Sequence, residues 1–178
     1  ESDPELYEEI KKAVKEGQWE PEGAMWLEAD TNLIHGESLI RQILYGKRFM
    51  KEEFGVENKI LWLPDVFGYS GALPQILKKC GVDQFFTAKM CWNETNPMPN
   101  DTFIWEGIDG SQVFTSVIDG YVRRLDPKQI YKTWKDYKNK SLTNDTLLTF
   151  GFGDGGGGPT YEMMENYERM KYGIPGMP

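Results

Sequence analysis

Short apolar segments that alternate with amphipathic segments restrict the fold of this chain more than any other feature. Residues 60–63 form a continuous apolar run, and apolar side chains then recur at helical spacing in residues 73–80. Residues 24–30 and 36–54 repeat this order of a strand followed by a helix. Strands that alternate with helices form mainly parallel sheets with helices on both faces. The sequence therefore predicts an α/β fold with a mainly parallel sheet, similar to an incomplete (β/α) barrel.

A β-hairpin is expected to interrupt this alternation. The dipeptide Asp109-Gly110 is the strongest signal for a tight turn, and it lies between two strand candidates, residues 102–106 and 111–118. The other strand candidates are residues 84–88 and 147–152.

Capping residues predict three further helices. Ser2 and Glu5 have the spacing of a capping box at the start of the first helix. Asp126 and Pro127 are typical of the N-cap and first position of a second helix, and the third helix follows Pro159.

The length of the chain is sufficient for one domain. Its 178 residues lie within the usual range of about 50 to 250 residues. The chain starts with Glu1 rather than Met and stops shortly after a charged helical stretch. We therefore expect residues 1–178 to be one piece of a longer domain.

Charge and cysteine content exclude several classes of partner. The net charge is −8 and no basic stripe is present that could neutralise phosphates, so nucleic acid is not an expected partner. No apolar run approaches the ~20 residues needed to cross a bilayer, so no membrane partner is expected. The two cysteines, Cys80 and Cys91, are too few for a disulfide framework, which favours a cytoplasmic location.

Two aspartates are candidates for catalysis because each follows an expected strand. Asp65 comes after residues 60–63, and Asp154 comes after residues 147–152. Ligands of such sheets bind at the carboxyl ends of the strands, and glycoside hydrolysis with retention needs two carboxyl groups about 5 Å apart. Alternatively, Asp65 caps the next helix and Asp154 is a turn residue.

The glycine run at residues 155–158 favours a functional role for Asp154. Four consecutive glycines are costly in a packed domain, so they indicate backbone close to a ligand or in conformations closed to other residues. A phosphate-binding loop would need Lys-Ser/Thr next, but Pro159-Thr160 follows the run.

Several long segments resemble the catalytic domain of glycoside hydrolase family 38 α-mannosidases, in particular its cytosolic and bacterial branch. The resemblance extends over residues 24–160, nearly the whole chain. The segments that carry it are residues 36–42 (GESLIRQ), 61–70 (LWLPDVFGYS), 102–111 (TFIWEGIDGS) and 151–160 (GFGDGGGGPT).

This resemblance implies a retaining α-mannosidase that acts on α-linked mannose oligosaccharides through a covalent mannosyl-enzyme. Asp65 matches the family's nucleophile, which is also a zinc ligand, and Asp154 matches its general acid/base. Phe67 matches a residue that packs near the metal and the sugar. Zinc would grip the hydroxyls at C2 and C3 of the sugar and help distort its ring.

The sequence departs from the family in its zinc ligands. The family's His-x-Asp pair and later histidine are missing, and the only histidine, His35, matches no zinc position and is more typical of a capping residue. Asp65 alone cannot build a four-coordinate zinc site. We expect the other ligands in the remainder of the full-length enzyme, and the isolated chain to be inactive.

Four residues are weaker candidates for substrate binding. Asp30 and Glu37 could face the sugar, although Glu37 and Arg41 also have the i, i+4 spacing of a helix surface pair. Lys89 could orient the Asp65 carboxylate, or it could be a solvated lysine. Trp92, outside any expected strand, is the best candidate for sugar stacking.

The tryptophans in expected strands, Trp26, Trp62 and Trp105, are interpreted as core residues, because alternate strand positions face the packed layers. Two other classes stay open: a carbohydrate-binding module that holds sugar on Trp92 and Phe67, and a structural domain without catalysis.

Overall fold

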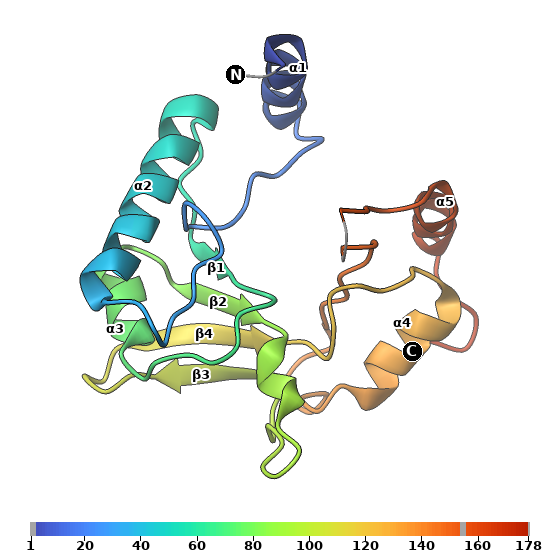
Figure 1. The fold of residues 1–178 in the computed structure, drawn as a ribbon. Helices are drawn as coiled ribbons and strands as arrows, with labels where there is room; N and C mark the ends of the chain where they lie inside the picture. The colour runs from blue at the N-terminus through green and yellow to red at the C-terminus, as the bar shows by residue number, and fades with distance from the viewer. Residues whose placement is uncertain (1–2, 154–155, 178) are drawn as a thin grey trace. The chain divides into compact units, whose positions relative to one another are not determined.

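The structure is a computed structural model that describes residues 3–153 and 156–177 (Figure 1). These residues form five α-helices, four β-strands and one 3-10 helix. They are α1 (Pro4–Lys15), α2 (Gly36–Phe54), β1 (Ile60–Trp62), α3 (Leu73–Lys79), β2 (Gln84–Thr87), η1 (Lys89–Trp92), β3 (Thr102–Glu106), β4 (Gln112–Val117), α4 (Pro127–Asp136) and α5 (Tyr161–Met170).

The chain divides into two compact units. The first comprises Glu1–Thr87 and Phe103–Ser116, and the second comprises Ala88–Thr102 and Val117–Pro178. The first unit contains α1, α2, α3 and most of the sheet, and the second contains η1, α4 and α5.

The sheet has the strand order β1-β2-β4-β3. β1 and β2 are parallel, with Leu61 opposite Phe85, and β2 and β4 run in the same direction in Figure 1, opposite to β3. The prediction of a mixed α/β fold with a mainly parallel sheet is therefore confirmed. In the described residues the sheet has four strands and is open, so the expected barrel-like closure is not confirmed.

The hairpin between β3 and β4 forms where the sequence predicted it. The Gly107 N–H donates to the Ser111 carbonyl (2.8 Å), and Gly110 has a φ of +82°, which favours glycine. The Asp109 carboxylate accepts the N–H of Ser111 (3.0 Å). Local turn chemistry thus determines the edge of the sheet.

Two expected strands do not form. Residues 24–30, all of them described, form no strand: residues 24–27 are bends, and the backbone N–H of Trp26 donates to the backbone carbonyl of Gln42 on α2 (2.9 Å) instead of to a strand. Residues 147–152, also described throughout, contain only one bridge, Gly151 with Arg123. Both segments have the apolar character of strands, but neither finds a full partner strand, and partner availability is a tertiary property.

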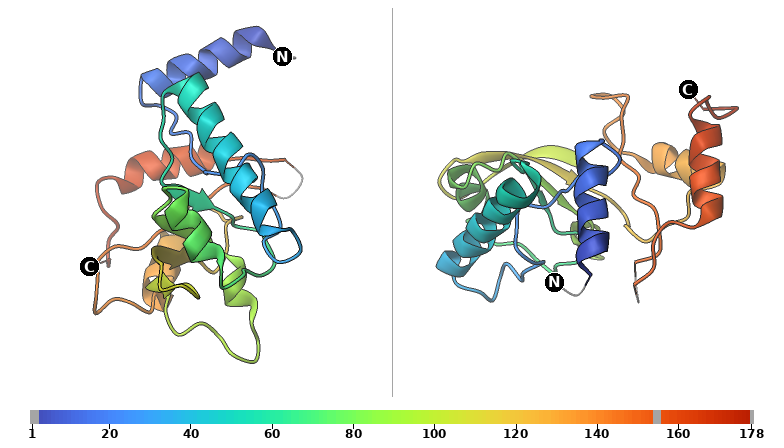
Figure 2. Two further views of the ribbon diagram at one scale, coloured as in Figure 1. Left: turned by 90° about the vertical axis from the view of Figure 1, so that its left-hand side faces the viewer. Right: turned by 90° about the horizontal axis from the view of Figure 1, so that it is seen from above.

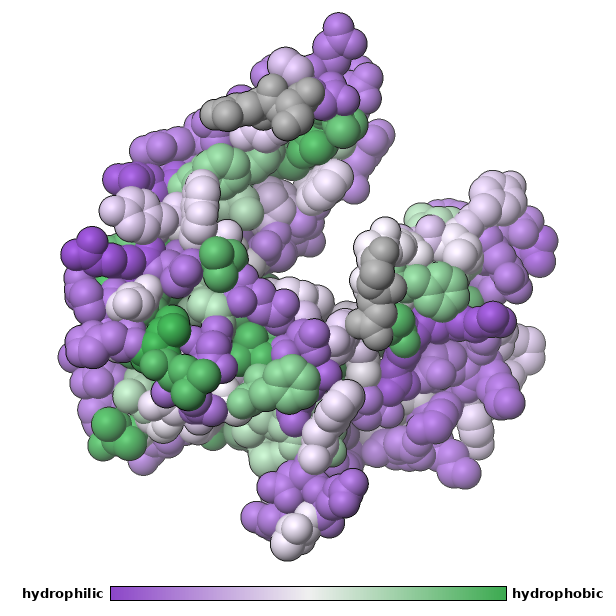
Figure 3. Space-filling view, viewed as in Figure 1, coloured by the Kyte–Doolittle hydropathy of each residue, from purple (hydrophilic) through white to green (hydrophobic). Residues whose placement is uncertain are grey.

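The core of the first unit lies between the sheet and its helices. Phe85 of β2 is buried, and its ring contacts the rings of Tyr69 (4.9 Å between centroids) and Trp105 (5.5 Å). Other fully buried side chains in this unit are Ile43, Leu61, Leu63, Leu73 and Leu77. Figure 3 shows apolar side chains at the surface in separate groups among polar ones.

The interpretation of the strand tryptophans as core residues is wrong for Trp26 and Trp62. Trp26 is 57% exposed, since residues 24–30 form no strand, and Trp62 is 38% exposed although it lies in β1. Trp105 is half-buried against Phe85, and Trp62 stacks on Phe86 with 3.9 Å between ring centroids.

The helices begin at capping residues, with one difference from the expectation. Asp3 caps α1 by accepting the Leu6 N–H (3.0 Å), whereas Ser2, the expected cap, lies outside the described residues. Asp126 caps α4 as predicted, by accepting the Gln129 N–H (2.8 Å). Short polar side chains at these positions replace the backbone acceptors that the first turn lacks.

α1 lies beside the C-terminal part of α2 (Figure 2). The Tyr7 hydroxyl donates to the Glu53 carboxylate (2.9 Å), and Lys11 forms an ion pair with the same group (2.9 Å). Among the described residues, no helix combines the length and the apolar composition that crossing a membrane would require.

Candidate active site

Asp65 lies at the carboxyl end of β1. The Leu63 N–H donates to the Phe86 carbonyl (3.0 Å), which extends the parallel pairing one residue beyond the strand. Pro64 has no N–H to continue the ladder, so the chain leaves the sheet there. Asp65 follows as a half-buried residue. The expected position of Asp65 just after the end of a parallel strand is confirmed.

The loop after β1 is bound along its length to the segment that precedes α2. The Asp65 N–H donates to the Glu28 carboxylate (2.8 Å). The hydroxyl of the buried Thr31 donates to the Gly68 carbonyl (2.7 Å). These side chain to backbone bonds hold the candidate nucleophile in one position relative to the sheet.

Gly68 permits the two segments to approach each other closely. Its φ is +107°, and a Cβ at this position would overlap the Asn32 side-chain amide, which donates to the Phe67 carbonyl (3.4 Å). Phe67 itself is 68% exposed.

Tyr69 joins the ends of β1 and β2. Its hydroxyl donates to the Leu63 carbonyl (3.0 Å) and is hydrogen-bonded to the Thr87 hydroxyl. Burial raises the pKa of Tyr69 to about 12, an increase that the Thr87 hydrogen bond opposes and the nearby Glu28 and Asp65 charges reinforce. The phenol is therefore a neutral donor at the base of the Asp65 loop.

Asp30 and Glu37 have structural partners in this unit. The Asp30 carboxylate accepts the N–H groups of Asn32 (2.8 Å) and Leu33 (2.7 Å), which shapes the turn beside the Asp65 loop. Glu37 pairs with Arg41 at 3.0 Å, and both side chains are exposed. The helix surface pair considered for Glu37 is thus present, and substrate binding by either acid stays a prediction.

Lys89 and Trp92 belong to the second unit. The Lys89 ammonium lies 3.6 Å from the centroid of the Trp92 ring and 5.4 Å from that of Tyr121. Trp92 is 64% exposed, as a sugar-stacking ring must be. The expected effect of Lys89 on Asp65 concerns residues of different units and stays a prediction.

Asp154, the expected general acid/base, lies outside the described residues. The glycines around it include Gly156, whose φ is +84°, and Gly157, where a Cβ would lie 2.6 Å from the Phe152 carbonyl oxygen. The prediction that the run contains backbone closed to other residues is confirmed at these positions. Here the close approach is to the chain itself.

The zinc expectation rests on Asp65 alone in this part of the chain. The Glu28 carboxylate accepts the backbone N–H of Asp65. Over the described residues, no three His, Cys, Asp or Glu side chains are grouped so that they could hold a metal ion. His35 caps α2 by accepting the Glu37 N–H (3.3 Å) through Nδ1. A carboxylate oxygen of Asp65 could take part in a zinc site only together with further ligands.

Sequence reasoning missed Glu28, Thr31 and Tyr69. Tyr69 lies within the motif that includes Asp65, so its presence there was a usable signal. Glu28 and Thr31 had no comparable signal, because their contacts with the Asp65 loop join residues 37 positions apart.

Proteins with similar sequences are α-mannosidases. Alpha-mannosidase G of Dictyostelium discoideum is 48% identical over 176 residues, which are 97% of this chain and 16% of that protein. Human Alpha-mannosidase 2C1 is 43% identical over 169 residues, 94% of this chain and 16% of that protein. The Saccharomyces cerevisiae alpha-mannosidase is 40% identical over 174 residues, 96% and 16% respectively.

Solved structures share the fold at lower identity. The alpha-mannosidase of Enterococcus faecalis superposes with a TM-score of 0.70 at 21% identity, covering 97% of this chain and 20% of that one. The 4-alpha-glucanotransferase of Thermococcus litoralis superposes with a TM-score of 0.59 at 17% identity, covering 94% of this chain and 27% of that one. Residues 1–177 match the family described as the glycosyl hydrolases family 38 N-terminal domain. This match over nearly the whole chain shows that the protein belongs to glycosyl hydrolase family 38.

Proposed function

We propose that this chain provides the nucleophile, Asp65, and the general acid/base, Asp154, of a retaining α-mannosidase. The observation that carries the proposal is the position of Asp65 at the carboxyl end of β1, bound to Glu28 through its N–H. Membership of family 38 and the α-mannosidase relatives support α-linked mannosides as the substrate class.

The reaction proceeds in two displacements. The Asp65 carboxylate attacks C1 of the mannoside and forms an ester bond, while the bond from C1 to the leaving oxygen breaks and Asp154 donates its proton to that oxygen. Asp154 then accepts a proton from a water molecule, whose oxygen attacks C1 and releases Asp65. Two inversions at C1 give net retention.

The contacts of the Asp65 loop support this role through preorganisation. A nucleophile gains rate when the scaffold holds it near the attacking geometry before substrate binds. The bonds from Asp65 to Glu28 and from Thr31 to Gly68 restrict the loop in this way. Phe67, exposed beside it, can contact the sugar ring.

Zinc is part of the proposal. Asp65 would contribute one ligand oxygen, and the others would come from outside this chain. When bound, the metal would supply Lewis acid character and a template for neighbouring sugar hydroxyls.

Replacing Asp65 with alanine in the complete enzyme tests the proposal. The variant should lose about a thousand-fold or more in turnover of an aryl α-mannoside, because no other group forms the ester. Asp136→Ala is a matched control, since this aspartate is exposed on α4 and paired with Lys132 (2.7 Å). Substantial residual activity in the Asp65 variant would contradict the nucleophile role.

The exposed rings of Phe67 and Trp92 favour one alternative, a carbohydrate-binding module without catalysis. It predicts that the complete protein binds mannosides and never hydrolyses them, and that alanine at either ring weakens binding. Turnover that depends on Asp65 would eliminate this alternative.

We also propose a cytoplasmic location. Cys80 and Cys91 are both free, and burial raises the pKa of both thiols. Unreactive free thiols are compatible with a reducing compartment.

A further inference from the structure

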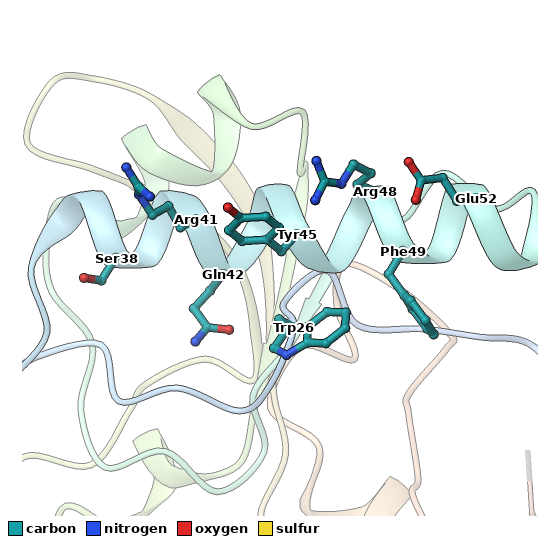
Figure 4. Close-up of a pocket in the computed structure, with 8 residues that line it drawn as sticks. All are labelled: Trp26, Ser38, Arg41, Gln42, Tyr45, Arg48, Phe49 and Glu52. Atoms are coloured by element: carbon teal, nitrogen blue, oxygen red, sulfur yellow. The ribbon is translucent and has the colours of Figure 1, made fainter. Parts of the chain in front are cut away.

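A pocket of about 560 Å³ lies along the exposed side of α2 (Figure 4). None of the residues that line it belongs to the Asp65 loop. The lining residues are Trp26, Ser38, Arg41, Gln42, Tyr45, Arg48, Phe49 and Glu52.

Trp26 is fixed against α2 while its ring stays exposed. Its backbone N–H donates to the backbone carbonyl of Gln42 (2.9 Å), and its ring contacts the Phe49 ring edge-on, with 5.4 Å between centroids. Gly46 allows this approach, because a Cβ there would lie 2.5 Å from the Ala24 carbonyl oxygen. Trp26 is 57% exposed and is already held against α2. A ligand that stacks on its ring would therefore lose little binding free energy to ordering of this side chain.

Planar polar groups flank this ring. The Gln42 side-chain oxygen accepts the Leu27 N–H (3.2 Å), which orients the amide. Tyr45 is 46% exposed, and the Arg48 guanidinium lies 4.9 Å from the centroid of its ring. Figure 4 shows the side chains of Arg41, Tyr45 and Arg48 in a row along α2. Such groups offer several hydrogen-bond donors and acceptors in fixed directions.

The charges of this pocket nearly offset one another. Arg41 is paired with Glu37 (3.0 Å), and Glu52 lines the pocket together with Arg48. A phosphate or an acidic peptide would need a surplus of positive charge. A purely apolar docking segment is also disfavoured, because five of the eight lining residues are polar or charged. A neutral ligand with both an apolar face and many hydroxyls fits best.

We propose that the α2 pocket is an accessory saccharide-binding site, separate from the Asp65 site. A pyranose presents C–H groups on one face, which stack on Trp26, and hydroxyls at its rim, which bind Gln42 and the arginines. The choice of a mannose oligosaccharide as its ligand rests on the proposed function.

Calorimetric titration of the complete enzyme with a trisaccharide of α-linked mannose tests the site. An Asp65→Asn background prevents hydrolysis during the measurement. We expect one binding component to be about ten-fold weaker or lost in Trp26→Ala, since removal of a stacking ring costs on the order of 1.4 kcal/mol. Trp19→Ala is the matched control, because Trp19 is 52% exposed and lies outside the pocket, and it should leave this component unchanged.

Tyr45→Ala provides a second, independent variant from α2 itself. It should weaken the same binding component. When Asp65 is left unchanged, the Trp26 and Tyr45 variants should both hydrolyse a small aryl mannoside at the wild-type rate. Unchanged trisaccharide binding in a folded Trp26 or Tyr45 variant would overturn the accessory site and leave the proposed function intact. Lack of aryl mannoside turnover by the wild-type enzyme would instead overturn the proposed function.

Discussion

At the scale of single residues, Tyr69 has the most consequences for the Asp65 loop. Its hydroxyl donates to the Leu63 carbonyl, just before Pro64, and is hydrogen-bonded to the Thr87 hydroxyl at the end of β2. It therefore links the ends of the two strands next to Asp65. Tyr69→Phe keeps the ring against Phe85 and removes only these bonds. The free energy of unfolding should fall by about 1 to 3 kcal/mol, because buried acceptors lose their partner. Denaturant unfolding measures this, with the exposed Tyr172→Phe as control.

The raised pKa of Tyr69 adds a pH dependence. The folded state binds the phenolic proton more tightly than the unfolded chain, whose pKa is near the ordinary value of 10.0. The resulting stabilisation is fully present below pH 10 and is lost as the pH rises through about 12. Unfolding measured across this range should show a steeper loss of stability in the wild type than in Tyr69→Phe. Parallel curves would contradict the assigned proton.

At the scale of elements, the packing of residues 24–26 on α2 depends on Gly46. Alanine is the better helix former, yet Gly46→Ala should destabilise by roughly 2 kcal/mol, because its methyl group would press on backbone rather than on a flexible side chain. Gly36→Ala at the start of the same helix meets nothing within 4 Å and should be neutral or slightly stabilising. Thermal unfolding compares the two. Equal effects would show that the segment can move away from α2.

At the scale of the whole molecule, the proposed zinc site bears on whether this chain can act alone. In that proposal Asp65 would supply one ligand oxygen, and a four-coordinate site needs more ligands than the described residues group together. The chain expressed by itself should therefore show no turnover of an aryl α-mannoside when zinc is added, whereas the complete enzyme should be active. Turnover by the isolated chain would contradict the proposal that the other ligands lie outside it.

The sequence by itself determined the features that depend on neighbouring residues. Three features follow from conformational preferences within a few positions of the chain: the hairpin at Asp109-Gly110, the cap at Asp126 and the end of β1 just before Asp65. Its motifs also led to family 38, because long ordered matches do not require knowledge of the fold.

Only the tertiary structure decided which groups distant in sequence meet. Residues 24–30 have the composition of a strand, but the Trp26 N–H bonds to Gln42 and the segment packs on α2 instead. The hydrogen bonds from the Asp65 N–H to Glu28 and from the Tyr69 hydroxyl to the Leu63 carbonyl likewise depend on the folded geometry. Apolar periodicity shows that a segment is to be buried, whereas its partner is selected by the packing of the whole unit.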